Sequence, residues 1–545
     1  MSFYFGGLWL PAKAETGGTM LVGAPGTGKT LMLRMTMGSV VSHFSDELDA
    51  RAVVADIKQD MVSILLGMGV PESRLCLMNP WDRRCHEWNM AADVTGPDVS
   101  LQIATIFIPE DTGQNRYFTD AARDLLTALM NVFIEKGREK QQQDGTKPEW
   151  TMADLVFAMR SRRHLVHVLG QTEEGRDLID LHLSAGETSI SVLSTARSRL
   201  APFAVPAALW RHAGRAGRRM SLQKFLKING GVLVLGNNAK AQAPMQAINR
   251  VLFLRLSQLV LDQTESATRR THFFLDELSK LGRLDGLDDL MRVGRSKGTA
   301  VMILFQDISG LRAVYGKDVA DEITAMCSSY GAFKLAGSES PEWASLLFGD
   351  QERREFHESH STNSGLSPQG FSTSANHGES EHIRQPRNFI ASQFRALPLP
   401  EKGEPLYGFF HTPFIPQEKS SWRKWLHIRE QRRGGAVSYE AAIPPEEIAE
   451  LLHEPASADL NFLPWIDEDG QENQSLKKLL PWDDADYRRL NIPPLPAAAD
   501  EKDTEKDKED ESADEDEESD AAARGGTTPH LSDVLFPDLP SARLS

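Results

Sequence analysis

The stretch Gly23-Ala24-Pro25-Gly26-Thr27-Gly28-Lys29-Thr30 determines the fold class expected for this chain. It fits the phosphate-binding pattern G-x-x-x-x-G-K-[ST] at every fixed position. A strand-like run ends just before it at Val22, and a helical pattern follows from Leu31 to Phe44. In such a loop the glycines let backbone N–H groups surround phosphate oxygens, while the start of the helix adds a positive dipole. The stretch therefore predicts a nucleotide site between a strand and a helix; the alternative is a glycine-rich turn without a ligand.

Two side chains of this loop have predicted chemical roles. Lys29 is expected to contact the β- and γ-phosphates, and the Thr30 hydroxyl is expected to ligate Mg²⁺. The predicted cofactors are therefore ATP and Mg²⁺. The residues predicted to bind the nucleotide are Gly23, Ala24, Pro25, Gly26, Thr27, Gly28, Lys29 and Thr30.

A phosphate loop works together with an acidic residue at the end of a neighbouring strand. The run His272-Phe273-Phe274-Leu275-Asp276-Glu277 provides four residues of apolar or aromatic character, counted from the histidine, followed by two acids. We predict that Asp276 binds the Mg²⁺ and that Glu277 orients or activates the attacking water. An ordinary strand that ends in a solvated acidic pair is the alternative.

Three further groups are predicted near the ends of strands, because ligands bind at the carboxyl ends of strands in open α/β sheets. Gln306 follows the strand-like run Thr299–Leu304 and is expected to sense the γ-phosphate. Arg295 precedes the same run; it is either an arginine finger for a neighbouring subunit or a surface arginine in a basic turn. Asp56-Ile57-Lys58 ends another strand-like run and either lines the nucleotide site, transmits its state, or forms a solvated turn.

The length of 545 residues predicts at least two folded units. Strand-like and helical patterns alternate in the first part of the chain, apolar residues at helical spacing dominate the next part, and strand-like runs then return. We therefore predict an α/β fold divided into 1–97, the first part of a P-loop motor domain; 98–227, an inserted all-α domain; 228–416, the second part of the motor domain; 417–499, a C-terminal extension; and 500–545, an acidic disordered tail.

The second half of the chain carries several local predictions. A Ser/Asn/Gly/His-rich stretch from Glu355 to Glu381 is expected to be a loop, and a short helix is expected over Pro445–His453. His357, His360 and His377 of this loop and the adjacent His382 lack ordered spacing and cysteine partners, so no metal site is expected there. Strands are predicted at Gly231–Leu235, Thr271–Asp276, Thr299–Leu304, Gly331–Leu335 and Pro405–His411.

The charge of the chain is unevenly distributed. The formal net charge is −17, but Asp500–Asp520 holds fourteen Asp/Glu against three Lys, a net of −11 that leaves −6 for all other residues. The total therefore says little about contact with DNA. Arginine clusters in the helical part either follow a nucleic-acid backbone or form solvated helix faces. These clusters are Arg160–Arg163, Arg197 with Arg199, and Arg211–Arg219.

Composition and hydropathy narrow the class of protein. With 40% hydrophobic and 25% charged residues, the chain is neither wholly disordered nor a disulfide scaffold. Three cysteines without metal-ligand spacing favour a reducing cytosol. No apolar run reaches the roughly 20 residues that span a bilayer. Met1–Pro11 is too short and too interrupted by Gly6 and Gly7 to be a signal peptide or a membrane helix.

Taken in order, the motifs resemble those of the coupling-protein ATPases of type IV secretion and bacterial conjugation, the TraG/TraD-like family. The resemblance covers about residues 18–416. Besides the phosphate loop, it rests on Asp56-Ile57-Lys58, Asn79-Pro80, Trp88-Asn89, Tyr117–Arg123, Leu275–Leu278, Gly294-Arg295, Phe305–Asp307, Ala396–Pro400 and Tyr407–Phe409.

The resemblance implies a RecA-like motor domain, an inserted all-α domain and a homo-hexameric ring that hydrolyses ATP between subunits. Such rings bring or pump single-stranded DNA, with its attached relaxase, to a type IV secretion channel; some members recruit protein effectors instead. The implied roles are phosphate and Mg²⁺ binding for Lys29 and Thr30, metal and water for Asp276 and Glu277, and coupling across the subunit interface for Arg295 and Gln306. An ATP-dependent assembly module without sustained turnover remains the alternative from another class.

Two departures from the family pattern are evident. Family members usually begin with a transmembrane region, whereas nothing before Gly23 is suited to cross a bilayer. We therefore expect a cytoplasmic protein, peripheral at the bacterial inner membrane through a separate membrane-anchored partner, or an isolated cytosolic part. Gln59-Asp60 replaces the usual Gly-Glu. In the tail, Pro529–Leu544 is predicted to be a recognition peptide for an accessory protein, with a merely solubilising tail as the alternative.

Overall fold

The computed structural model describes most of the chain up to residue 496. The predicted acidic tail and its recognition peptide lie outside the described residues. For three strands, 353–367, 370–384 and 426–431, only the backbone is described. The described ranges are 3–113, 115–184, 186–350, 353–367, 370–384, 387–414, 426–431 and 437–496.

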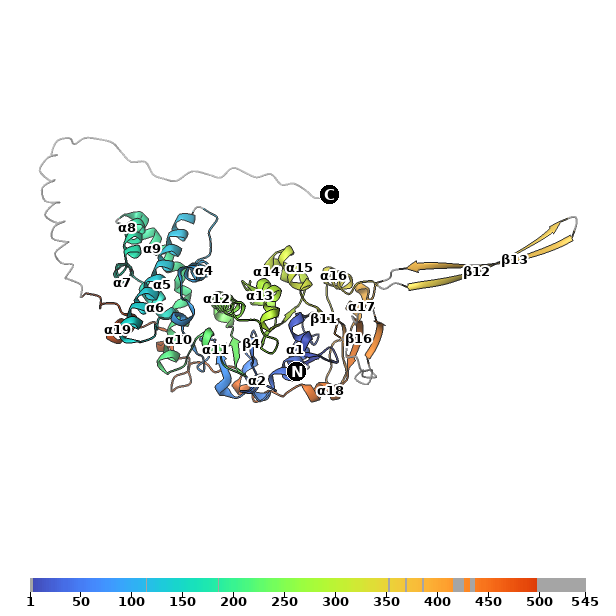
Figure 1. The fold of residues 1–545 in the computed structure, drawn as a ribbon, viewed down its shortest axis with the longest axis horizontal. Helices are drawn as coiled ribbons and strands as arrows, with labels where there is room; N and C mark the ends of the chain where they lie inside the picture. Colours follow the sequence, from blue (N-terminus) through green and yellow to red (C-terminus); the bar gives the residue numbers. More distant parts are fainter. Residues whose placement is uncertain are drawn as a thin grey trace, which may run out of the picture. The chain divides into compact units, whose positions relative to one another are not determined.

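A ten-stranded mixed sheet organises the described part of the chain, with the strand order β15-β16-β14-β11-β3-β10-β9-β4-β8-β5 (Figure 1). The seven strands from β11 to β5 are parallel, and the other three pair antiparallel. The strands are β3 (Thr19–Val22), β4 (Ala50–Ala55), β5 (Leu75–Leu77), β8 (Val232–Leu235), β9 (Arg270–Leu275), β10 (Thr299–Phe305), β11 (Ser329–Ala332), β14 (Leu406–Thr412), β15 (Leu426–Gln431) and β16 (Val437–Ile443).

The strands predicted from apolar runs are confirmed, within a few residues at each end. Strand β3 lies between β10 and β11, and all four of its residues are buried. Burial on both faces is typical of parallel strands that are covered by helices, and it explains why these runs are almost continuously apolar. Helices α1 (Lys29–Val41) and α2 (Met61–Gly67) contribute to the core cluster on one face. On the other face, α12 (Gln242–Leu261) packs Phe253 against Phe273 of β9.

A short hairpin at the start of the chain joins this core. Strands β1 (Phe3–Phe5) and β2 (Leu8–Leu10) pair antiparallel, and Phe5 makes an edge-to-face contact with Phe410 of β14, 5.6 Å between ring centroids. The turn between the strands needs glycine, because Gly6 has φ +57° and a Cβ there would lie 2.6 Å from the Phe410 ring. Sequence reasoning missed this hairpin.

Helices occupy almost all of the segment between β5 and β8, and they gather beside the sheet (Figure 1). The longest is α5, whose apolar face is buried. No helix in the described ranges is long and apolar enough to cross a bilayer. The principal helices are α4 (Pro97–Phe107), α5 (Arg116–Asp144), α6 (Met152–Ala158), α7 (Arg162–Leu169), α8 (Glu173–His182), α9 (Glu187–Leu200) and α10 (Ala204–Arg215).

The expectation of a loop over Glu355–Glu381 is wrong. Strands β12 (Arg353–Ser367) and β13 (Gly370–Arg384) form an antiparallel ladder whose register runs from Arg353↔Arg384 to Ser367↔Gly370. A ladder bonds backbone groups, so a stretch rich in Ser, Asn and Gly can pair without an apolar alternation. The composition therefore carried a turn signal but no strand signal.

Residues 444–493, here called the strap, run from the part of the chain that forms the ten-stranded sheet to the helical segment. The helix predicted over Pro445–His453 is confirmed as α18 (Pro445–Leu451), and α19 (Asp484–Leu490) lies near the other end. Backbone carbonyls of the strap accept hydrogen bonds from motor side chains, for example Leu460 O from Arg84 at 2.9 Å. The indole of Trp465 donates in return to Pro80 O at 2.9 Å. The strap is therefore part of the folded body.

The strap ends on a buried charge network in the helical segment. Asp154 of α6 is completely buried and accepts hydrogen bonds from Arg489 at 2.8 and 2.9 Å and from the Trp482 indole at 3.1 Å. Arg211 of α10 forms an ion pair with Asp486 of the strap. These contacts link α6 and α10 through the strap.

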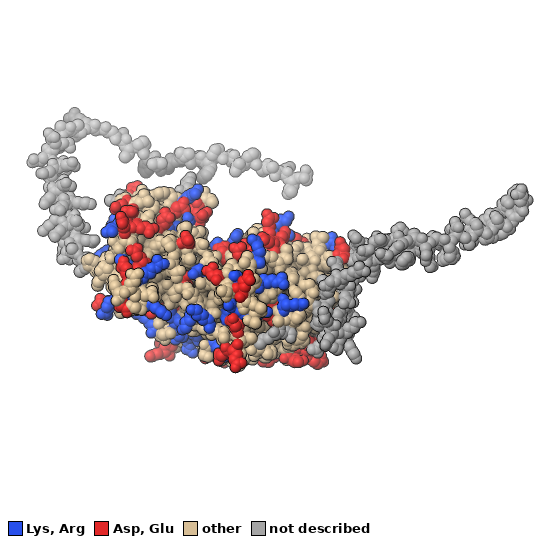
Figure 2. Space-filling model, viewed as in Figure 1, with Lys and Arg blue, Asp and Glu red and all other residues tan. Residues whose placement is uncertain are grey.

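The arginines of the cluster Arg211–Arg219 have partners within the chain, some buried and some exposed. Arg215 pairs with Asp483 at 3.1 Å, and Arg219 pairs with Glu87 at 2.8 Å. These partners favour the structural interpretation of this cluster over a DNA-binding one. On the face shown in Figure 2, basic and acidic side chains are interspersed.

Candidate nucleotide site

The phosphate loop leaves the carboxyl end of β3 and leads directly into α1, the context in which such loops bind phosphate. Two of its glycines adopt the left-handed backbone, Gly26 with φ +72° and Gly28 with φ +102°. At Gly28 a Cβ would also lie 2.4 Å from Leu406 Cδ1 of β14. The left-handed conformation therefore favours glycine at this position, and a larger residue would also require the Leu406 side chain to shift.

Lys29 is the first residue of α1, and only 4% of it is exposed. Its ammonium donates to Gly23 O at 2.5 Å and to Ala24 O at 3.0 Å, while Thr27 Oγ1 donates to Ala24 O at 2.7 Å. Burial lowers the pKa of Lys29, although the carboxylates of Glu277 and Asp276 oppose the shift. The loop thus encloses a cation whose hydrogen bonds go to its own backbone, and phosphate oxygens would be stronger acceptors for it.

The predicted acidic pair lies at the same edge of the sheet. Asp276 follows β9, and its Oδ2 accepts a hydrogen bond from Thr30 Oγ1 at 3.3 Å. Among the described residues, Asp276 Oδ1 and Glu277 Oε2 are buried atoms without a hydrogen-bond partner. Burial raises the pKa of Asp276, while Lys58 counteracts the rise. Glu277 has φ +52°, a conformation in which non-glycine residues concentrate at functional sites.

The Asp56-Ile57-Lys58 segment also reaches this edge, and Lys58 contacts both residues just described. Its ammonium donates to Thr30 Oγ1 at 3.0 Å and lies 3.7 Å from Asp276 Oδ2. Asp56 itself is buried, and its Oδ1 accepts a hydrogen bond from the Asp60 N–H at 3.0 Å. Burial, aided by the Asp60 carboxylate, raises the pKa of Asp56 to about 7.

Gln59 stands where the sequence pattern usually has glycine, and its side chain is held by hydrogen bonds. Its φ is +61°, which a glycine adopts without cost. The Gln59 side chain donates to Asn237 O at 2.6 Å, and the Asn237 side chain donates back to Ile57 O at 3.2 Å. Sequence reasoning missed Asn237; the available signal was its position just after the strand-like run at Val232–Leu235.

The structure separates the remaining two predicted residues. Gln306 follows β10, which lies between β3 and β9, and the Gly23 N–H donates to Phe305 O at 3.4 Å. Gln306 therefore lies beside the phosphate loop. Arg295 belongs to the turn Gly294–Lys297 that precedes β10, so it lies at the opposite edge and is exposed. Arg295 is not part of its own chain's site.

The residues at this edge fit a Mg²⁺ ion. Oxygen ligands are the ones that Mg²⁺ prefers, and Thr30 Oγ1 and Asp276 Oδ2 lie within 3.3 Å of each other. The unpartnered Asp276 Oδ1 adds acceptor capacity. A cation already contacts both groups, because the Lys58 ammonium stands beside them. Thr30 and Asp276 are therefore the residues that would hold the metal.

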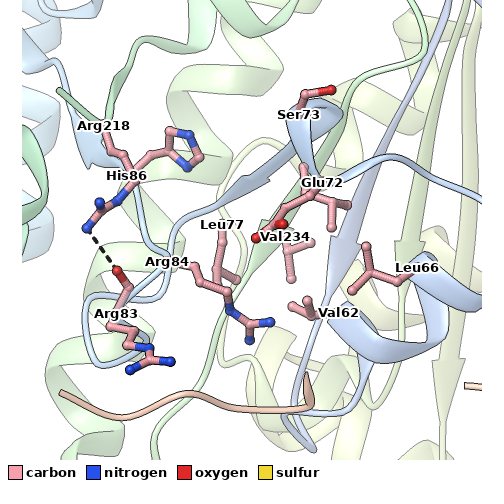
Figure 3. Close-up of a pocket in the computed structure, with 11 residues that line it drawn as sticks. Val62, Leu66, Glu72, Ser73, Leu77, Arg83, Arg84, His86, Arg218 and Val234 are labelled. Atoms are coloured by element: carbon pink, nitrogen blue, oxygen red, sulfur yellow. Dashed lines mark hydrogen bonds between the residues drawn. The ribbon is translucent and has the colours of Figure 1, made fainter. Parts of the chain in front are cut away.

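Two cavities of the described body lie away from the phosphate loop. One of about 730 Å³ is bordered by Gln59 and Asn238 of the motor domain, Leu209 of α10 and Trp465 of the strap. The other, of about 570 Å³, lies at the edge strand β5, where Arg218 donates to Arg83 O at 2.8 Å (Figure 3). Its lining consists of Val62, Leu66, Glu72, Ser73, Leu75, Leu77, Arg83, Arg84, His86, Arg218 and Val234.

Comparison with known families accounts for this arrangement. A sequence model of the family described as type IV secretion-system coupling protein DNA-binding domain matches residues 2–400. The chain belongs to this family. The match of the coupling-protein family includes the phosphate loop, the acidic pair and the helical segment between them. The resemblance seen in the motifs is confirmed.

Individual coupling proteins are distant from this chain in sequence. Coupling protein TraD of Escherichia coli strain K12 is 18% identical over 359 residues, which cover 65% of this chain and 46% of TraD. The chain thus spans about half the length of that relative.

Solved structures of the coupling protein TrwB have a similar fold. Unbound TrwBdeltaN70 is 19% identical, with a TM-score of 0.56 over 84% of this chain and 90% of that one. TrwB in complex with ADP and Mg²⁺ is also 19% identical, with a TM-score of 0.55 over 85% and 91%. At this identity the likeness shows the fold, so the predicted α/β P-loop fold with an inserted all-α domain is confirmed.

Proposed function

We propose that this chain is an ATP-driven coupling protein that recruits relaxase-bound single-stranded DNA and delivers or pumps it to a type IV secretion channel during conjugative transfer. The observation that carries the proposal is the meeting of the phosphate loop, Thr30, Asp276 and Glu277 at one sheet edge. Membership of the coupling-protein family supports the transport role, and the TrwB complex with ADP and Mg²⁺ supports the cofactors.

Four residues of the chain have separate proposed roles in ATP hydrolysis. Lys29 exchanges the carbonyls of Gly23 and Ala24 for the β- and γ-phosphate oxygens. Thr30 and Asp276 would hold the Mg²⁺, which would neutralise phosphate charge when bound. Glu277 orients the attacking water and accepts its proton, because its unpartnered Oε2 is an available acceptor.

The positions of Gln306 and Arg295 support hydrolysis between subunits. Gln306 lies beside the phosphate loop and is proposed to contact the γ-phosphate. Arg295 lies at the opposite edge of the sheet, so it can act only in a neighbouring copy's site. We propose a homo-hexamer in which Arg295 stabilises transition-state charge across the interface.

The remaining proposals concern partners. We propose that the hexamer acts at the bacterial inner membrane through a separate membrane-anchored protein and contacts relaxase and channel components. An accessory protein is the proposed ligand of the C-terminal tail. A pull-down with and without residues 500–545 tests the last proposal, and unchanged partner binding would end it.

Two measurements test the transport function. ATP hydrolysis by the full chain is expected to rise when single-stranded DNA is added; a rate indifferent to DNA would instead favour a coupling ATPase for protein effectors. Conjugative transfer is expected to be lost in Glu277→Gln and retained in Glu342→Gln, which changes an exposed glutamate on the surface. Transfer that survives Glu277→Gln would favour an assembly module without sustained turnover.

A further inference from the structure

Lys58 stands between the two groups that are proposed to bind the metal. Its ammonium lies 3.0 Å from Thr30 Oγ1 and 3.7 Å from Asp276 Oδ2. We infer that Lys58 is a built-in cation, which holds Thr30 and Asp276 together in the nucleotide-free protein and is displaced by the divalent ion that arrives with the nucleotide. The inference rests on the proposed nucleotide site and concerns its regulation.

The need for such a cation follows from the burial of the acidic pair. Asp276 and Glu277 are adjacent carboxylates that are 2% and 5% exposed. Burying two neighbouring negative charges is costly unless a cation is close. Lys29 acts on both carboxylates through space, but its hydrogen bonds go to Gly23 O and Ala24 O and not to the pair. Lys58 is the cation in contact with Asp276 in the described structure.

Lys58 and a metal ion exclude one another at this position. Mg²⁺ binds oxygen ligands at about 2.1 Å. An ion bound to Thr30 Oγ1 and Asp276 Oδ2 would therefore lie directly beside the present position of the Lys58 ammonium. The two positive charges would repel each other. Because 48% of the Lys58 side chain is exposed and its stem is flexible, the ammonium can move into solvent at low cost.

The loop that carries Lys58 leads away from the nucleotide site. Gln59, the next residue, is hydrogen-bonded to Asn237 and borders the 730 Å³ cavity. The other walls of that cavity include Leu209 of α10 and Trp465 of the strap. Release of Lys58 by the metal would therefore alter the loop on the side that faces the helical segment, which gives the nucleotide state a physical route to that segment.

Metal binding by the nucleotide-free full chain tests the inference directly. Mn²⁺, which has a paramagnetic resonance signal, is titrated into wild type and Lys58→Met in the absence of nucleotide. Without the competing ammonium, Lys58→Met is expected to bind Mn²⁺ about 3- to 10-fold more tightly, a range set by the modest strength of a half-exposed ion pair. Lys58→Arg, which keeps the charge, is expected to behave like wild type.

The matched control is Lys280→Met, which removes an exposed lysine near the site. It reports the effect of net charge alone and is expected to change Mn²⁺ affinity by less than the Lys58 substitution does. The melting temperature in EDTA should fall more in Lys58→Met than in Lys280→Met, because Asp276 then loses its cation.

Two outcomes would overturn the inference: unchanged or weaker Mn²⁺ binding by Lys58→Met, or equal effects of the two substitutions. Nucleotide binding is measured separately with a fluorescent ADP analogue and Mg²⁺. A wild-type chain that fails to bind the analogue would contradict the proposed function, whereas the Mn²⁺ titration would still decide the role of Lys58.

Discussion

Asp276 at the edge of the motor sheet and Asp154 beneath the strap are equally hidden from solvent, yet their surroundings differ. Burial works to raise the pKa of Asp154, but Arg489, Arg211 and the Thr151 N–H together outweigh it and lower that pKa below its ordinary value. Burial raises the pKa of Asp276 in spite of Lys58. Both oxygens of Asp154 accept hydrogen bonds, whereas Asp276 Oδ1 has no partner in the described structure.

The difference separates structural charge from functional charge. A buried carboxylate that only stabilises a fold is supplied with partners by the chain itself, as Asp154 is by Arg489 and Trp482. A buried carboxylate that awaits a ligand keeps acceptor capacity open, at a cost in stability. The unpartnered Asp276 Oδ1 and Glu277 Oε2 fit the proposed metal and water site because they lie next to the phosphate loop, and both sides of the contrast can be tested by substitution.

The largest effect is expected at the acidic pair beside the phosphate loop. Glu277→Gln removes the proposed proton acceptor but keeps the shape of the side chain. ATP turnover should fall by about 10²- to 10⁴-fold, the usual contribution of general acid–base catalysis. Nucleotide affinity should change little, as a fluorescent ADP analogue would measure. A parallel loss of affinity and turnover would mean that Glu277 is structural, like Asp154.

Arg211→Met tests the buried charge network beneath the strap, because it removes the partner of Asp486. Removing one partner of a buried ion pair leaves the other uncompensated, and the expected loss of unfolding free energy is about 2–4 kcal/mol. The lower part of that range reflects the remaining contact of Asp486 with Arg489 at 3.0 Å. Chemical denaturation measures the change. Arg197→Met, at an exposed position of α9, is the control and should stay within about 0.5 kcal/mol; equal effects would contradict the assigned network.

A smaller, pH-dependent effect is expected at Asp56. Its folded pKa of about 7 exceeds the unfolded value of about 4, so between these values the folded chain binds more protons. Its contribution to stability is complete below the unfolded pKa and is lost as the pH rises through the folded pKa. Asp56→Asn should therefore gain stability relative to wild type as the pH rises from about 4 to about 7. Parallel melting-temperature curves for the two proteins would refute the shift.

The smallest effect concerns the backbone at Gln59. Both Gln59→Gly and Gln59→Ala remove the hydrogen bond to Asn237, but only alanine keeps a Cβ at φ +61°. Gln59→Gly should be the more stable of the two by about 0.5–1 kcal/mol, less than the full left-handed penalty because glycine also gains entropy when unfolded. Denaturation of the pair measures the difference, and a more stable alanine variant would mean that the loop relaxes.

Local patterns were enough to predict which residues meet at the candidate nucleotide site. A few neighbouring residues are enough to recognise each part of the site: the glycines of the phosphate loop, Lys29, and the acidic pair after β9. Parallel strands then bring their carboxyl ends to one edge of the sheet. The positions of Lys58 and Asn237 at this edge could not be predicted in the same way. They depend on the strand order, which no local pattern specifies.

The strap was not predictable in the same way. Asp154 and Arg489 lie 335 positions apart, and no local sequence pattern near either residue predicts that they pair. The arginines of α10 equally fit a solvated face, a nucleic-acid surface or a set of internal partners, and only the fold distinguishes these. The ladder of β12 and β13 was missed because backbone pairing left no apolar alternation in the sequence.

The place of β3 in the sheet has a consequence for how the protein is made. This strand, which carries the phosphate loop, pairs only with β10 and β11 among the described strands. A ribosome must therefore synthesise roughly three hundred further positions before β3 finds its neighbours, and its four buried residues are exposed throughout that interval. Closing so long a loop is also slow. Protection of the nascent chain by chaperones is thus an expected step in its biogenesis.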